Sequence, residues 1–214
     1  MSRSVTIIDY GIGNILNVVR AFEQIGTEVT LAKSSSDLKQ VERVVLPGVG
    51  AFSHGMNQLK DLAIAERIKE ISNEGMPLLG ICLGMQMLLS YSEEHGKTKG
   101  LDIMPGKVIA VPECGIDNTT HKIPHTGWNE LKLSGDRDDW SGTLLADVNI
   151  DSPVYFVHSF MAVPDDYSMH VADCEYDGQS ICAVVQRDNV MGCQFHPEKS
   201  GEVGLQILRS FISM

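Results

Sequence analysis

Residues 80–86 read Gly80-Ile81-Cys82-Leu83-Gly84-Met85-Gln86, and they follow the apolar run Met76-Pro77-Leu78-Leu79. This order predicts a strand that runs into a cysteine, which in turn opens a helix. A sharp strand-to-helix turn lifts its central side chain clear of the backbone, and only small neighbours relieve the resulting strain. The first amides of the helix favour a thiolate over a thiol. The stretch therefore predicts a nucleophile at Cys82, with a buried, inert thiol as the alternative.

The chain before this stretch alternates between strand-like and helical patterns. Four β-rich runs lie at 5–8, 28–31, 43–46 and 77–81. A helical pattern at 15–25 separates the first run from the second, and another at about 57–72 separates the third from the fourth. A strand, helix, strand order of this kind predicts a parallel sheet with right-handed crossovers.

The second half of the chain has a different composition. Residues 112–143 are rich in Gly, Asp, Asn, Thr and Pro, which is typical of loops and hairpins. Further β-rich runs and a final helical pattern follow at 154–157, 170–172, 181–186, 190–195 and 203–212. We expect one α/β domain over residues 1–214, with a mostly parallel central sheet, flanking helices, and a second half rich in loops and hairpins.

Composition and charge exclude several classes of protein. The chain has 214 residues and a formal net charge of −11, so neither nucleic acid nor an anionic membrane surface is an expected partner. No apolar run approaches the ~18 residues of a membrane-spanning helix. Five cysteines without framework spacing indicate reduced thiols. Because no secretory pattern is visible at the start, we expect a cytoplasmic protein.

A cysteine nucleophile needs a base, and the base needs a group that orients it. The segment Gln194-Phe195-His196-Pro197-Glu198 follows a β-rich run. His196 and Glu198 are two residues apart, so in extended backbone they project to the same side. The carboxylate can then hold one imidazole nitrogen while the other faces the sulfur. The alternative is a surface histidine beside an incidental glutamate.

Acyl transfer also needs donors for a developing oxyanion. The amide of Leu83, next after the nucleophile, is the natural first donor. The turn Pro47-Gly48-Val49-Gly50 can bring the Val49 amide close as a second, unless it is an ordinary β-turn. Gln86 lies one helical turn after Cys82 and could contact a polar substrate. His121 and His125 have the spacing of helical metal ligands, but Pro124 interrupts the helix, so no metal or other cofactor is expected.

Several motifs together resemble a known family. The cysteine elbow and His196-Pro197-Glu198 resemble the class I glutamine amidotransferases, and the likeness narrows to the glutaminase subunits of imidazole glycerol phosphate synthase. The motifs that narrow it occur in this order: Asp9-Tyr10-Gly11-Ile12-Gly13-Asn14, Pro47-Gly48-Val49-Gly50-Ala51-Phe52, Ile123-Pro124-His125-Thr126-Gly127-Trp128-Asn129, Tyr155-Phe156-Val157-His158-Ser159-Phe160 and Phe195-His196-Pro197-Glu198-Lys199-Ser200-Gly201. Thr126 and Phe160 depart from the family pattern.

The resemblance implies a flavodoxin-like fold and glutamine hydrolysis to glutamate and ammonia, with Cys82, His196 and Glu198 as the catalytic triad. It implies substrate contacts at Gly50, Leu83, Gln86, Ser159 and Phe160, with Val49 and Leu83 as oxyanion donors. It also implies a heterodimer with a (β/α)8 cyclase subunit. That partner would use the ammonia to make imidazole glycerol phosphate and an aminoimidazole carboxamide ribonucleotide in histidine biosynthesis. The positions expected to face it are Tyr10, Asn14, Trp128 and Lys199.

Two other classes of function stay open from the residues alone. One is a free-standing cysteine hydrolase on the same scaffold, or the amidotransferase subunit of another synthetase. The other is a binding or regulatory protein whose triad has decayed. The motifs at 9–14 and 123–129 argue against the first, and the intact set Cys82, Gln86, His196 and Glu198 argues against the second.

Overall fold

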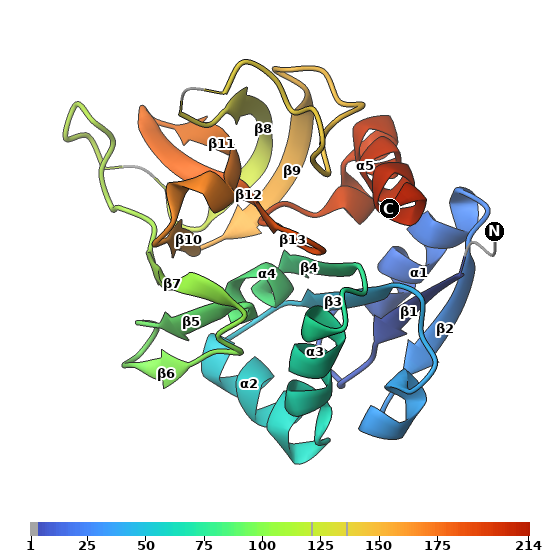
Figure 1. Ribbon diagram of the computed structural model, residues 1–214. Helices are drawn as coiled ribbons and strands as arrows, with labels where there is room; N and C mark the ends of the chain where they lie inside the picture. Colours follow the sequence, from blue (N-terminus) through green and yellow to red (C-terminus); the bar gives the residue numbers. More distant parts are fainter. Residues whose placement is uncertain (1–3, 121, 136) are drawn as a thin grey trace.

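The computed structural model describes residues 4–120, 122–135 and 137–214, and its centre is a large mixed sheet (Figure 1). Among these residues nine strands pair in the order β2-β1-β3-β4-β13-β12-β11-β8-β9. The first five are mutually parallel: β2 (Glu28–Ala32), β1 (Ser4–Ile8), β3 (Val44–Gly48), β4 (Leu78–Cys82) and β13 (Val190–Cys193). The others continue antiparallel: β12 (Gln179–Arg187), β11 (His170–Tyr176), β8 (His125–Leu133) and β9 (Pro153–His158). The α/β class and its parallel core are therefore confirmed.

Helices cover both faces of the parallel strands (Figure 1). Successive strand residues point to opposite faces, so Ile7 and Ile8 enter different cores. Ile7 packs in the core that contains Phe22 and Phe211, while Ile8 packs in the other with Met56. The first core lies under α1 (Ile15–Gln24) and α5 (Gly201–Ser213), and the second under α2 (Phe52–Asp61) and α3 (Ile64–Asn73).

The helical pattern at about 57–72 corresponds to two helices, and the first of them begins earlier, at Phe52. The segment forms two helices, α2 and α3, which meet at Leu62 and Ala63. Ala63 has a left-handed backbone with φ 54°, which ends one helix and redirects the chain into the next. Because both helices keep an apolar face toward the same core, hydrophobic periodicity alone did not reveal the break.

A second sheet, absent from the sequence prediction, joins the two halves of the chain. Within the described residues it has four strands: β10 (Phe160–Pro164), β7 (Met104–Ala110), β5 (Leu89–Ser92) and β6 (Thr98–Lys99). Strand β8 also lies inside the stretch that we predicted as loops and hairpins. These strands are short or polar on one side. Their formation therefore depends more on pairing with distant segments than on the residue pattern of each segment. Short 3-10 helices complete the fold: η1 (Ser35–Leu38), η2 (Tyr167–Met169) and η3 (Pro197–Lys199).

Glycines allow the turn after β4 to pack tightly against the sheet. Helix α4 (Leu83–Met87) follows Cys82 directly. A Cβ on Gly84 would overlap the carbonyl oxygen of Leu46 in β3, and a Cβ on Gly80 would lie 2.7 Å from the Met85 amide nitrogen. Both contacts are with backbone atoms, which cannot move aside. The flanking glycines are therefore required by the close approach of α4 to β3 and β4.

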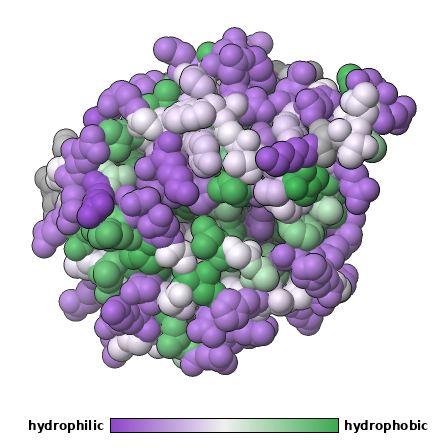
Figure 2. Space-filling model, turned by 180° about the vertical axis from the view of Figure 1, so that it is seen from behind, coloured by the Kyte–Doolittle hydropathy of each residue, from purple (hydrophilic) through white to green (hydrophobic). Residues whose placement is uncertain are grey.

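The surface is mostly polar, with apolar side chains showing between polar ones on the face opposite the view of Figure 1 (Figure 2). Large apolar side chains with more than half of their surface exposed in the described part of the chain are Leu16, Ile116, Trp128 and Tyr167. Within the same residues, no helix combines the length and apolar character that spanning a membrane requires. His121, one of the two histidines considered above, lies outside the described residues.

We expect Gly84→Ala to lower the free energy of unfolding by about 3 kcal/mol or more, because its methyl group meets a fixed carbonyl oxygen. The matched control is Gly26→Ala. Gly26 has φ +78° but open space around a Cβ, so this change should cost only about 1–2 kcal/mol for the backbone conformation. Chemical denaturation of both variants measures the difference, and equal losses would contradict the steric explanation.

Candidate active site

Cys82 lies at the end of β4 in a strained conformation, with φ 54° and ψ −110°. A non-glycine residue with this backbone costs about 1–3 kcal/mol, and such strain often occurs at functional sites. The residue is 6% exposed. Its Sγ lies 4.0 Å from the Val157 carbonyl oxygen and 3.7 Å from Nε2 of Gln194, which can donate to the sulfur. The turn thus holds the sulfur at the edge of the sheet in contact with polar groups.

The structure brings His196 and Glu198 together just beyond the neighbouring strand β13. Nδ1 of His196 and Oε1 of Glu198 are 2.8 Å apart, and both side chains are almost fully buried. The His196 backbone is anchored to β9, because its amide donates to the Tyr155 carbonyl oxygen at 2.9 Å. Ser200 reinforces this contact: its hydroxyl donates to the His196 carbonyl oxygen and accepts from the Tyr155 amide.

Electrostatics connect this histidine to the cysteine. Burial by itself disfavours the imidazolium, but interactions with Cys82 and Glu198 outweigh it and raise the pKa of His196 from 6.5 to about 10. Nε2 makes no aligned hydrogen bond to a described residue, so the nitrogen on the cysteine side is not committed to another partner. The arrangement can therefore hold a proton between a sulfur and a carboxylate-oriented imidazole.

A pocket of about 440 Å³ opens onto the sulfur. Its wall includes the residues predicted for substrate and oxyanion binding, namely Val49, Gly50, Leu83, Gln86, Ser159 and Phe160, together with Cys82. His196 and Glu198 are not part of the wall. The predicted pocket residues thus meet at one site although they come from three separate segments of the chain.

Besides His158, which lines the pocket, two polar residues of the site were not identified from the sequence. Gln194 is completely buried, and its Oε1 accepts from Nε2 of Gln86 at 3.0 Å. Nε2 of Gln86 also donates to the Phe160 carbonyl oxygen at 2.9 Å. Glu94 lines the pocket, and its Oε2 accepts from the Phe52 amide at 2.6 Å. Neither residue occurs in a pattern that predicts these contacts, which depend on segments far apart in the sequence.

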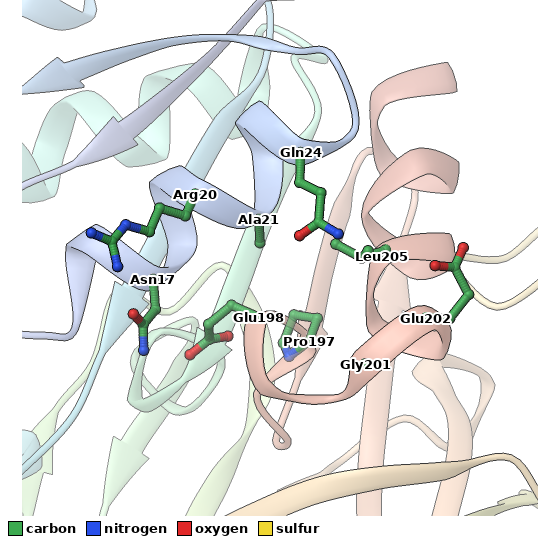
Figure 3. Close-up of a pocket in the computed structure, with 9 residues that line it drawn as sticks. All are labelled: Asn17, Arg20, Ala21, Gln24, Pro197, Glu198, Gly201, Glu202 and Leu205. Carbon is green, nitrogen blue, oxygen red and sulfur yellow. The ribbon is translucent and has the colours of Figure 1, made fainter.

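Glu198 also borders a second pocket, of about 400 Å³, between α1 and α5 (Figure 3). Asn17 and Arg20 line this pocket from α1, and the Asn17 side chain lies on the Glu198 side, whereas the Arg20 guanidinium is directed away from it (Figure 3). Oε2 of Glu198 is buried without a hydrogen-bond partner among the described residues. The pocket therefore lies directly behind the carboxylate that orients His196.

Three of the four residues predicted to face a partner are exposed: Asn14, Trp128 and Lys199. Nζ of Lys199 lies 5.8 Å from the centre of the Tyr155 ring, which in turn makes an edge contact with Trp128. Tyr10 is the exception, and its prediction as a partner contact is wrong. It is 1% exposed, because it packs beneath Gly48 and its hydroxyl donates to the Pro47 carbonyl oxygen at 2.9 Å. Tyr10 instead supports the turn that carries Val49.

No group of three or more His, Cys, Asp or Glu side chains is arranged as a metal site within the described ranges. A sulfur, an oriented imidazole and nearby backbone amides can carry out nucleophilic acyl transfer.

Comparison with known proteins identifies relatives over the whole length. Residues 6–214 match the glutamine amidotransferase class-I family. The chain is 51% identical over 211 residues to imidazole glycerol phosphate synthase subunit HisH 1 of Legionella pneumophila (strain Paris), covering 99% of each chain. It is 42% identical to the HisH subunit of Geobacter sulfurreducens, covering 98% of each. The solved structure of PurLQS from Thermotoga maritima, at 20% identity, shares the fold with a TM-score of 0.72 and covers 100% of this chain and 99% of that one.

We expect the pKa of His196 to fall from about 10 in Cys82→Ala, because one of the two groups that stabilise the imidazolium is removed while burial still disfavours it. NMR titration of the ring nitrogens measures this shift. Cys114→Ala is the control, since Cys114 is a half-buried thiol in a separate loop. An unchanged His196 titration in Cys82→Ala would show that the sulfur does not interact with the ring.

Proposed function

The chain belongs to the class-I glutamine amidotransferases and, within them, to the HisH subunits of imidazole glycerol phosphate synthase, and on this basis we propose that it hydrolyses glutamine through Cys82, His196 and Glu198. The observation that carries the proposal is the placement of the Cys82 sulfur at the pocket, with the buried His196–Glu198 pair interacting with it. The glutamate and ammonia that result are the products expected of this family.

The first half of the reaction forms a thioester. The Cys82 thiolate attacks the side-chain amide carbon of glutamine, and a carbon–sulfur bond forms. His196 then donates its Nε2 proton to the amide nitrogen as the carbon–nitrogen bond breaks, and ammonia leaves. Glu198, at 2.8 Å from Nδ1, keeps the ring oriented and stabilises the imidazolium before the transfer.

The second half releases glutamate. Water attacks the thioester carbon, His196 accepts its proton, and the thiolate departs. In both halves the negative oxygen needs donors, and we assign this role to the backbone amides of Leu83 and Val49, two residues that line the pocket. The turn at Gly48–Gly50 includes Gly50 at φ 95°, so the Val49 amide belongs to a segment with unusual backbone freedom.

The charged and polar residues that line the pocket indicate how glutamine would bind. Among the described residues that line the pocket, Glu94 is the acidic one, and we assign it to the α-ammonium group of glutamine. Gly50, Gln86, Ser159 and Phe160 provide the polar backbone and amide groups that orient the rest of the molecule. Their hydrogen-bonding groups suit an uncharged amide at the end that meets Cys82.

The chain acts as one subunit of a synthase, as its relatives' names state of them. We further propose that the chain forms a heterodimer with a (β/α)8 cyclase subunit. That subunit takes up the ammonia to form imidazole glycerol phosphate and an aminoimidazole carboxamide ribonucleotide. The exposed residues Asn14, Trp128 and Lys199 support a docking face beside the site. The turn before Asn14 adjoins the turn at 48–50 that carries the Val49 amide, since a Cβ on Gly13 would lie 3.8 Å from the Gly48 Cα.

We expect glutamate release to rise strongly only when both the cyclase subunit and its nucleotide substrate are present, because a coupled site avoids wasting glutamine. Cys82→Ala should lose this activity by about 10⁴-fold or more. It should retain binding to the cyclase subunit. Cys114→Ala is the matched control. Equal activity of the chain alone and in the complex would favour a free-standing hydrolase, and no activity under either condition would refute the proposed function.

We expect Trp128→Ala to weaken binding of the cyclase subunit at least tenfold, since an exposed tryptophan at an interface centre commonly contributes 2 kcal/mol or more. Tyr167→Ala is the control: Tyr167 is 61% exposed, compared with 58% for Trp128, but it belongs to η2 and contacts His170. Titration calorimetry with the cyclase subunit compares the two. Equal dissociation constants would remove Trp128 from the interface.

A further inference from the structure

A row of buried and partly buried hydrogen bonds connects β8 to the pocket. Nδ1 of His158 lies 2.9 Å from the Phe160 carbonyl oxygen, and Nε2 of the same ring lies 3.0 Å from Nδ1 of His125. Nε2 of His125 is 3.4 Å from Nδ2 of Asn129. His125 and His158 are 3% and 6% exposed. The two imidazoles therefore meet ring to ring in the interior, and His158 itself lines the active-site pocket beside Phe160.

The chemistry of the partners determines which nitrogen carries each proton. A carbonyl oxygen only accepts, so His158 donates from Nδ1 to Phe160. Burial, together with nearby His125 and His196, lowers the pKa of His158 to about 4 against the opposing effect of that carbonyl, so the ring is neutral at pH 7. Its Nε2 is then an acceptor, and the proton between the two rings belongs to Nδ1 of His125.

Asn129 determines which atom donates at the β8 end of the row. Its Oδ1 accepts from the Glu130 amide at 2.8 Å, and its Nδ2 donates to the Glu175 carbonyl oxygen at 2.6 Å, which fixes the orientation of the amide. Nδ2 also lies 3.4 Å from Nε2 of His125, and because an amide nitrogen only donates, this ring nitrogen accepts. Every bond in the row thus has one donor and one acceptor.

Aromatic packing keeps His125 in place. Its ring stacks with Phe156, at 4.9 Å between centroids, and with Tyr176, at 4.1 Å. These two stacked neighbours restrict rotation of the imidazole and keep Nδ1 directed at His158.

The other end of the row is the Phe160 carbonyl group, which contacts several polar residues of the site. The Phe160 carbonyl oxygen accepts from His158 and from Nε2 of Gln86. Gln86 also donates to Gln194, whose own Nε2 contacts the Cys82 sulfur at 3.7 Å. A displacement of the Phe160 carbonyl would therefore disturb both the substrate wall and the groups around the nucleophile.

We propose that His158 is a positioning residue for glutamine hydrolysis: its Nδ1–H fixes the Phe160 carbonyl and thereby the Gln86–Gln194 pair, while His125 holds His158 in the required tautomer. This inference rests on the proposed function. It adds two histidines that do not take part in the proton transfers assigned to His196. It also links the pocket to β8, which carries the exposed Trp128.

Two substitutions of one residue test the role in the complex with the cyclase subunit. An asparagine places its amide nitrogen near the position of Nδ1, whereas a glutamine places it near Nε2. We expect His158→Gln to lower kcat/KM for glutamine at least tenfold, equivalent to about 1.4 kcal/mol or one lost hydrogen bond, mainly through a higher KM. His158→Asn should restore activity to within about threefold of the wild type. His54→Gln, on the exposed face of α2, is the control.

The outcomes separate this inference from the proposed function. A folding defect lowers kcat by reducing the active fraction and leaves KM unchanged, so that result, or equal impairment of His158→Gln and His158→Asn, would overturn the role. Wild-type activity in His158→Gln would overturn it as well. If the wild-type complex releases no glutamate, the proposed function fails instead. Long-range ¹H–¹⁵N NMR then still tests the row: both histidines should carry the proton on Nδ1, and a proton on Nε2 of His158 would refute it.

Discussion

The close packing of helix α4 against strands β3 and β4 is the contact on which the active site depends. It requires glycine at positions 80 and 84, because any larger side chain there would meet backbone atoms. The same packing holds Cys82 at φ 54°, a conformation that an isolated chain would avoid. The energy of a well-packed interior thus maintains local strain, and the strain places a sulfur at the open edge of the sheet.

Strand pairing then brings the other groups to the sulfur. Strand β13 lies beside β4 in parallel register, with Cys193 opposite Ile81, so the residues after both strands emerge at the same edge. His196 enters here and is tied to β9 through Tyr155 and Ser200. Strand β9 ends at His158, which continues the polar contacts to Phe160. The site is therefore a junction of the parallel part of the sheet with its antiparallel extension.

Residues whose role depends on local geometry could be predicted. The glycines around Cys82 and the two-residue spacing of His196 and Glu198 each indicate a function within a few positions of sequence. Gln194, Glu94 and His158 carry no such local pattern, because each contacts a partner at a distant position. Tyr10 was assigned to the partner face from the family resemblance, which carries no information about its burial beneath Gly48.

The sequence by itself determined the α/β class, the parallel strands before Cys82, the elbow and the family, since these follow from periodicity, turn chemistry and contiguous motifs. It did not determine the second sheet, the break between α2 and α3, or the row from Asn129 to the sulfur. Those features were decided by tertiary structure. A buried amide or imidazole needs a partner wherever the fold supplies one, and the identity of that partner is not encoded at any nearby position.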